Sequence, residues 1–225
     1  MSFNFLESLN ENQKKAVLHT SGPLLILAGA GTGKTRVLTT RLANILKKKL
    51  ANPFETLTVT FTNKAASEMK HRVEEMLKIG TDGWWIGTFH AMGARILRKH
   101  QEIVGLKSQF SIIDIDDQIR LIKQALSYHN VDEKRWPARL IHNIIQRWKD
   151  KGLNPEDISN DEIFGDVAGK KIYRTYQNRL ITLNVVDYGD LLLQNLNIFR
   201  NNPEILITYQ KKFKYILVDE YQDTN

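Results

Sequence analysis

The chain has 225 residues, of which 42% are hydrophobic and 25% charged, so it carries enough apolar side chains for a sizeable core and is not a disordered chain. It contains no cysteine, which excludes disulfides, thiolate metal sites and a cysteine nucleophile, and fits a reducing cytoplasm. The longest apolar run, residues 24–30, is too short to span a membrane, and residues 1–20 lack the apolar stretch of a signal peptide. We therefore expect a soluble, cytoplasmic protein that does not enter a membrane.

The charge is unevenly distributed along the chain. The net charge is +7, but residues 1–108 carry 16 basic and 8 acidic residues, whereas residues 109–225 carry 16 and 17. A basic excess confined to one half is typical of a surface that binds nucleic acid or phosphate. Solvated lysine side chains with no ligand are the alternative explanation.

The first half alternates between strand-length apolar runs and helical patterns. Leu24–Ala28 is short and continuously apolar, which predicts a fully buried parallel strand. Further strands are predicted at 56–61 and 84–88. Apolar residues at helical spacing predict helices at 33–49, 63–78 and 91–104. This alternation predicts an α/β fold with a parallel sheet.

The middle of the chain, residues 109–185, is predicted to be mostly helical. Gly152 has the position of a helix C-cap, and residues 152–170, rich in Gly, Pro, Asn and Asp, predict a loop. The α/β pattern then resumes, with helices predicted at 187–199 and 204–212 and a strand at 215–218. The simplest organisation is a helical block inserted in an α/β domain.

A glycine-rich sequence, AGAGTGKT, joins the first predicted strand to the first predicted long helix. Glycines let backbone N–H groups turn inward around phosphate oxygens, and the helix N-terminus adds positive charge. We expect Lys34 to reach the β- and γ-phosphates of ATP and the Thr35 hydroxyl to hold Mg²⁺. The expected phosphate-binding residues are Ala28, Gly29, Ala30, Gly31, Thr32, Gly33, Lys34 and Thr35. Ala28 departs from the usual pattern, which opens with Gly, and a glycine-rich turn that binds nothing is the alternative.

The last predicted strand ends in Asp219 and Glu220. This places a carboxylate at the edge of the sheet where a phosphate-binding loop also lies. Asp219 is expected to hold Mg²⁺, and Glu220 to activate the attacking water as general base. A merely polar strand end is the alternative.

Several motifs in order resemble superfamily 1 DNA helicases of the UvrD/Rep/PcrA type. Besides the glycine-rich loop, LNENQ (9–13) resembles their Q motif and TFTNKAA (60–66) resembles their motif Ia. GTFH (87–90) resembles motif Ib, and VDEYQDTN (218–225) resembles motif II. DYGDLL (187–192) is similar to the family's segment before motif II. The resemblance extends from Leu9 to Asn225, and the middle block is matched by its placement alone.

The resemblance implies a fold and a domain organisation. The fold is a P-loop NTPase (RecA-like) parallel sheet with an inserted, mostly helical subdomain. Residues 1–108 and 186–225 correspond to the ATP-binding lobe, and residues 109–185 to the inserted subdomain. The family's motif III, its second lobe and its arginine fingers follow motif II, so the chain is expected to be an N-terminal fragment of a longer protein.

The resemblance also assigns roles to single residues. Gln13 matches a glutamine that contacts adenine; it also fits a helix-capping box with Asn10, and both roles can hold at once. Arg36 matches an arginine that stacks on adenine; a solvated helix arginine is the alternative. Gln222 matches a glutamine that senses the γ-phosphate. The expected catalytic residues are therefore Lys34, Asp219, Glu220 and Gln222.

The expected DNA contacts lie where predicted strands end and helices begin. They are Thr62, Asn63, Lys64, Thr88, Phe89 and His90. Such positions offer hydroxyls, amides and helix N-terminal N–H groups to phosphate, and aromatic rings to bases. Thr62 as a helix cap and Phe89 as a core residue are the alternatives.

The implied function is that of the ATP- and single-stranded-DNA-binding lobe of an ATP-dependent 3′–5′ DNA helicase. The implied cofactors are ATP and Mg²⁺, and the implied partners are single-stranded DNA and single-strand/duplex junctions. The implied cellular process is DNA repair or replication. Two alternatives stay open. One is the helicase lobe of a helicase–nuclease subunit, and the other is a non-catalytic ATP- and DNA-binding module, which is expected not to unwind DNA alone.

Overall fold

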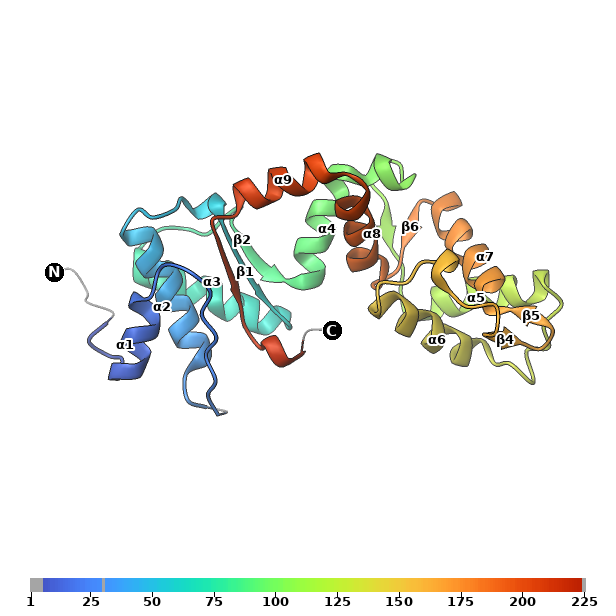
Figure 1. The fold of residues 1–225 in the computed structure, drawn as a ribbon, viewed down its shortest axis with the longest axis horizontal. Coiled ribbons are helices and arrows are strands. Elements are labelled where there is room, and N and C mark those ends of the chain that lie inside the picture. The colour runs from blue at the N-terminus through green and yellow to red at the C-terminus, as the bar shows by residue number, and fades with distance from the viewer. Residues whose placement is uncertain (1–5, 30, 224–225) are drawn as a thin grey trace. The chain divides into compact units, whose positions relative to one another are not determined.

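We describe the fold from a computed structural model that covers residues 6–29 and 31–223 (Figure 1). The described residues divide into two compact units, one formed by 6–92 and 206–223 and the other by 93–205. Two helices, α4 (Phe89–His100) and α9 (Pro203–Lys212), extend across the division points. The family resemblance places its domain boundaries elsewhere, at 108/109 and 185/186, and that assignment stays a prediction. Within the described part, no helix is both long and apolar enough to cross a membrane.

The first unit is built on a three-stranded parallel sheet in the order β2-β1-β7. The strands of this sheet are β1 (Thr56–Thr60), β2 (Trp85–Thr88) and β7 (Tyr215–Val218). The unit also contains α1 (Glu11–Leu18), α2 (Lys34–Lys47), α3 (Asn63–Leu77) and short 3₁₀ turns at Pro53–Glu55 and Tyr221–Asp223. The mixed α/β class with a parallel sheet is thus confirmed. Because parallel strands end at the same edge, the residues that follow β1, β2 and β7 come together there.

Helices cover both faces of this sheet. Leu38 and Leu42 of α2 and Met69 of α3 pack on one face in a single buried cluster with Ile86 and Leu217. On the other face, Trp85 stacks edge-on against Tyr209 and Phe213, at ring-centroid distances of 6.4 and 5.1 Å. Burial on two faces explains why these strands read as apolar or β-branched runs.

The predicted strand at Leu24–Ala28 is wrong. Residues 23–29 form no strand, and Leu25 and Leu27 are 67% and 86% exposed. An apolar run becomes a strand only when a neighbouring strand pairs with its backbone groups. The described sheet supplies no such partner, so residues 23–29 lead to the glycine-rich loop without regular secondary structure.

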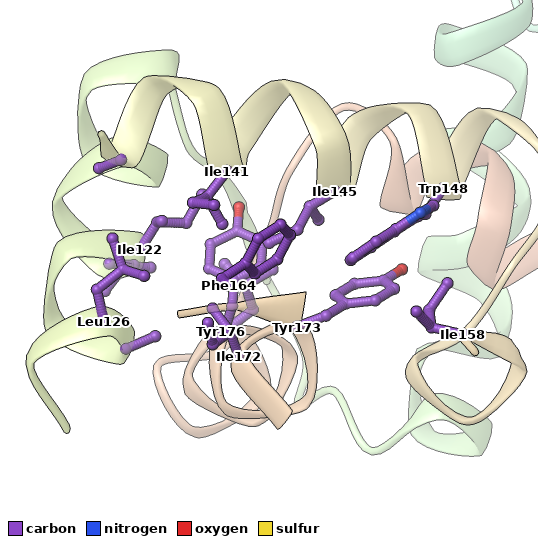
Figure 2. Close-up of a cluster of buried hydrophobic side chains, with 14 residues drawn as sticks. Ile122, Leu126, Ile141, Ile145, Trp148, Ile158, Phe164, Ile172, Tyr173 and Tyr176 are labelled. Carbon is purple, nitrogen blue, oxygen red and sulfur yellow. The ribbon is translucent and has the colours of Figure 1, made fainter. Parts of the chain in front are cut away.

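The second unit is mainly helical. Its elements are a 3₁₀ turn at Gln101–Val104, β3 (Ser111–Ile112), α5 (Ile115–Tyr128), α6 (Ala138–Asp150), a 3₁₀ turn at Pro155–Asp157, β4 (Ile163–Phe164), β5 (Val167–Ala168), α7 (Gly169–Thr182), β6 (Val185–Val186) and α8 (Asp190–Asn201). Figure 2 shows aliphatic and aromatic side chains of α5, α6, α7 and β4 pointing into one core. The predicted helices are confirmed, whereas the predicted loop 152–170 contains the antiparallel pair β4–β5.

Candidate nucleotide and DNA site

The glycine-rich loop leads directly into α2. Gly31 and Gly33 have φ angles of +73° and +90°, a left-handed conformation that glycine adopts without strain. The Thr32 hydroxyl donates to the Gly29 carbonyl at 2.7 Å, which closes the turn. Of the predicted loop residues, only Ala30 lies outside the described part of the chain.

Lys34, the first residue of α2, points back over this loop. Its Nζ donates to the carbonyl oxygens of Ala28 and Gly29, at 3.1 and 3.2 Å. The ammonium group therefore lies beside the loop and the α2 N-terminus, where a helix dipole favours an anion. This arrangement suits a phosphate, which would replace two neutral carbonyl acceptors by charged ones.

One hydrogen bond of the site joins residues that are 184 positions apart in the chain. The Thr35 hydroxyl donates to Oδ2 of Asp219 at 3.2 Å. Burial raises the pKa of the Asp219 carboxyl above its ordinary value, and the hydrogen bond from Thr35 opposes this shift. Mg²⁺ binds oxygen ligands, commonly one or two carboxylates together with substrate phosphates. The Thr35 hydroxyl and the Asp219 carboxylate fit that ion.

Glu220 follows Asp219 in an unusual backbone conformation, with φ at +50°. A glutamate rarely adopts this left-handed region, and such positions concentrate at functional sites. Its carboxylate is half-buried and accepts a hydrogen bond from the Gln222 side-chain amide. The two predicted catalytic residues are thus in contact, on the turn that follows β7.

Gln13 and Arg36 flank the loop from two helices. Gln13 forms the predicted capping box with Asn10 at the start of α1, and its amide also donates to the Thr32 carbonyl at 3.0 Å. The capping role is therefore real, and it leaves Gln13 in contact with the loop. Arg36 is exposed in the first turn of α2.

The predicted DNA residues lie at the ends of two neighbouring strands, which pair in register at Thr60 and Thr88. The Thr62 and Thr88 hydroxyls each accept a backbone N–H three residues on, at 3.1 Å, so the former caps α3 and the latter binds the first turn of α4. The other predicted contacts differ in exposure: Asn63 and Lys64 are exposed, and Phe89 and His90 are half-buried. The sequence patterns did not reveal Phe61, which they place in a strand and which is 54% exposed at this edge.

A buried ionic cluster in the second unit was also missed. Lys149 of α6 lies 2.7 Å from Asp187 and 2.8 Å from Asp190, and all three side chains are at most 1% exposed. Tyr176 and Gln146 donate further hydrogen bonds to Asp187. Burial favours the neutral form of Asp187, but Lys149 outweighs it and holds the pKa of that carboxyl below its usual range. Burial and the charge of Asp187 raise the pKa of Asp190.

Comparison with known proteins identifies the family of the chain. The family described as UvrD/REP helicase N-terminal domain matches residues 9–225. A probable DNA helicase II homolog of Rickettsia felis is 52% identical over 226 residues, which is 99% of this chain and 34% of that protein. The ATP-dependent DNA helicase PcrA of Bacillus subtilis is 44% identical over 231 residues (100% and 31%), and DNA helicase II of Escherichia coli is 42% identical over 220 residues (98% and 31%).

The chain spans about a third of the length of these curated relatives, and it matches their N-terminal region. The motif order that resembles this family and the profile match cover the same residues, from Leu9 to Asn225. The chain therefore belongs to the UvrD/REP helicase family, as an N-terminal domain of that family.

Proposed function

We propose that this chain is the ATP- and single-stranded-DNA-binding lobe of an ATP-dependent 3′–5′ DNA helicase that acts in the cytoplasm in DNA repair or replication. The lobe has a RecA-like P-loop fold, in which residues 109–185 form an inserted subdomain. It works on single-stranded DNA and on single-strand/duplex junctions. The relatives' names supply ATP dependence and the helicase activity; the polarity, the pathway and the junction preference come from the family resemblance.

One observation carries the nucleotide part of the proposal, namely the hydrogen bond between Thr35 and Asp219. It brings the loop that begins α2 to the carboxylate that ends β7. A glycine-rich turn that binds no ligand does not need a buried carboxylate beside it, and burying the Asp219 carboxylate costs free energy of folding. Mg²⁺ bound by these two oxygens would neutralise phosphate charge; Lys34 would bind the β- and γ-phosphates, and Glu220 would accept the proton of the attacking water.

Replacing Lys34 by alanine is expected to weaken the binding of Mg–ADP by about 10- to 100-fold, because a hydrogen bond to a charged group contributes roughly 1.5–3 kcal/mol. Calorimetric titration of the 225-residue chain measures this affinity. Lys47→Ala, at the far end of the same helix, is the matched control and should bind like the unmodified chain. Equal affinities for the two variants would remove Lys34 from the site.

The DNA part of the proposal rests on the paired strand ends. Two helix N-termini, an exposed lysine and the exposed ring of Phe61 lie at one edge of the sheet. Lys64 and the N–H groups at the start of α3 would bind phosphate, and Phe61, Phe89 and His90 would stack on bases.

Changing Lys64 and His90 together to alanine is expected to weaken binding to an oligo-dT strand at low salt. It should also reduce the slope of log affinity against log salt by about 0.7 for each phosphate group that the variant no longer neutralises. Fluorescence anisotropy at several salt concentrations gives the slope. Lys70→Ala, an exposed lysine further along α3, controls for a general loss of positive charge. A slope unchanged from that control would return both residues to a structural role.

A further inference from the structure

Three threonines alternate along the central strand β1. Thr56, Thr58 and Thr60 are each at most 1% exposed, and their spacing of two places all three on the same face of the sheet. The Thr56 hydroxyl donates to the Pro53 carbonyl at 2.9 Å. The hydroxyls of Thr58 and Thr60 have no hydrogen-bond partner among the residues that the structure describes. A buried hydroxyl without a partner destabilises the fold, and valine would fill the same space without that cost.

The surroundings of the two unpartnered hydroxyls differ. Thr58 is in register with Ile86 on one side and Leu217 on the other, so its neighbours across the sheet are apolar. Thr60 is in register with Thr88. On its other side, the backbone N–H of Asp219 donates to the Val59 carbonyl at 2.9 Å, which continues the parallel ladder and sets Asp219 opposite Thr60.

Asp219 directs its carboxylate to the face on which Thr60 lies. Leu217, two residues earlier, packs with α2 on that face, and Asp219 itself accepts the hydrogen bond from Thr35 of α2. Neighbouring strands lie about 4.8 Å apart, so the Thr60 hydroxyl and the Asp219 carboxylate are adjacent side chains of one row. Thr60 is therefore the unpartnered hydroxyl of β1 that stands beside an ionisable group.

We propose that the Thr60 hydroxyl positions the metal-binding carboxylate, by donating a hydrogen bond to Asp219 when that carboxylate binds Mg²⁺. The inference rests on the proposed nucleotide site. Carboxylates that ligate a metal are themselves hydrogen-bonded, and loss of such an outer partner typically costs 10- to 100-fold in metal affinity. The hydrogen bond to Asp219 would thus offset the cost of burying the Thr60 hydroxyl.

Thr60 also lies next to the candidate DNA residues in the sequence. The residue directly precedes Phe61, and the candidate DNA residues Thr62, Asn63 and Lys64 follow within four positions. The metal site and the DNA edge thus share one strand end.

The test compares two isosteric substitutions on the same strand face. Thr60→Val and Thr58→Val each remove a buried, unpartnered hydroxyl, and both variants should fold and melt no lower than the unmodified chain. The readout is the Mg²⁺ concentration that half-saturates the binding of a fluorescent ADP to the 225-residue chain, with the affinity for the same ADP in EDTA measured alongside.

Thr60→Val is expected to raise the half-saturating Mg²⁺ concentration by about 10- to 100-fold. Thr58→Val should leave the half-saturating Mg²⁺ concentration within about twofold of that of the unmodified chain. Thr60→Ser keeps the hydroxyl and should give the value of the unmodified chain. Thr60→Ala should show the same rise as Thr60→Val, which provides the measurement if valine does not fit. The affinity in EDTA should be the same for all variants, because the metal is then absent.

A Thr60→Val variant that needs no more Mg²⁺ than Thr58→Val would overturn the inference and leave the proposed nucleotide site standing. An equal rise in Thr60→Val and Thr60→Ser would overturn it too, since the shape of the side chain and not its hydroxyl would then matter. If the unmodified chain binds ADP equally well with Mg²⁺ and in EDTA, both the inference and the proposed metal site are overturned.

Discussion

Replacing Lys149 by methionine is expected to lower the free energy of unfolding of the helical unit by about 3–5 kcal/mol, the usual cost of removing one partner of a buried ion pair. Methionine nearly matches the aliphatic part of the lysine, so the substitution removes mainly the ammonium group, whose Nζ lies 5.8 and 5.3 Å from the ring centroids of Tyr173 and Tyr176. The change leaves Asp187 and Asp190 buried without a cation. The destabilisation is therefore electrostatic in origin and not a cavity effect.

Denaturant titration followed by circular dichroism measures this destabilisation. Lys151→Met is the matched control, because Lys151 lies two residues further along the chain and is exposed. Surface substitutions of that kind usually change stability by less than about 0.5 kcal/mol. The triple variant that also carries Asp187→Asn and Asp190→Asn should recover part of the stability. Equal unfolding midpoints for Lys149→Met and Lys151→Met would show that the cluster does not hold α6 to α8.

The same variant has an expected pH dependence. Without Lys149, burial raises the pKa of both carboxyls, and a carboxyl whose folded pKa is raised favours the folded state as the pH falls. In the unmodified chain only the pKa of Asp190 is raised, whereas that of Asp187 is lowered and its contribution is lost only in acid. The stability difference between the two proteins should therefore shrink from pH 7.5 to pH 5. A defect in packing alone would not produce that trend.

Local patterns in the sequence predicted most of the helices and three of the strands. The helical spacing of Ile122 and Leu126 identified α5, and the β-branched run at 56–61 identified β1, because each pattern repeats the period of its element. The prediction at 24–28 failed because a strand forms only beside a neighbouring strand, and the local sequence pattern does not reveal whether that neighbour exists. The pair β3–β6 was missed for the same reason, since each strand has two residues and its partner is 74 positions away.

The candidate site divides in a similar way. The glycine-rich loop and the Asp-Glu pair were predicted from local composition, and the structure brings Thr35 and Asp219 together as that pairing requires. The ionic cluster was not predicted, because Lys149 reads as a surface lysine of an amphipathic helix and its partners come from another part of the chain. The unusual φ of Glu220 likewise has no signature in the residue type.

Glu220 is the residue on which hydrolysis should depend most. Replacing it by glutamine keeps its size and its place on the turn after β7 but removes the acceptor for the proton of the attacking water. The rate of ATP hydrolysis is expected to fall by about 10²- to 10⁴-fold, the usual contribution of a general base. The affinity for Mg–ADP should change little, because Lys34, Thr35 and Asp219 stay in place. Binding and hydrolysis should thus separate in one variant.

Asp223 offers the sharpest comparison, since it is a second carboxylate, exposed and three residues further along the same turn. The decisive measurement is single-turnover ATP hydrolysis by the intact protein that contains this chain, with protein in excess, Mg²⁺ saturating and single-stranded DNA present. The account predicts a fall of about 10²- to 10⁴-fold for Glu220→Gln and a near-normal rate for Asp223→Asn. A near-normal rate for Glu220→Gln, with the fall in Asp223→Asn instead, would contradict it.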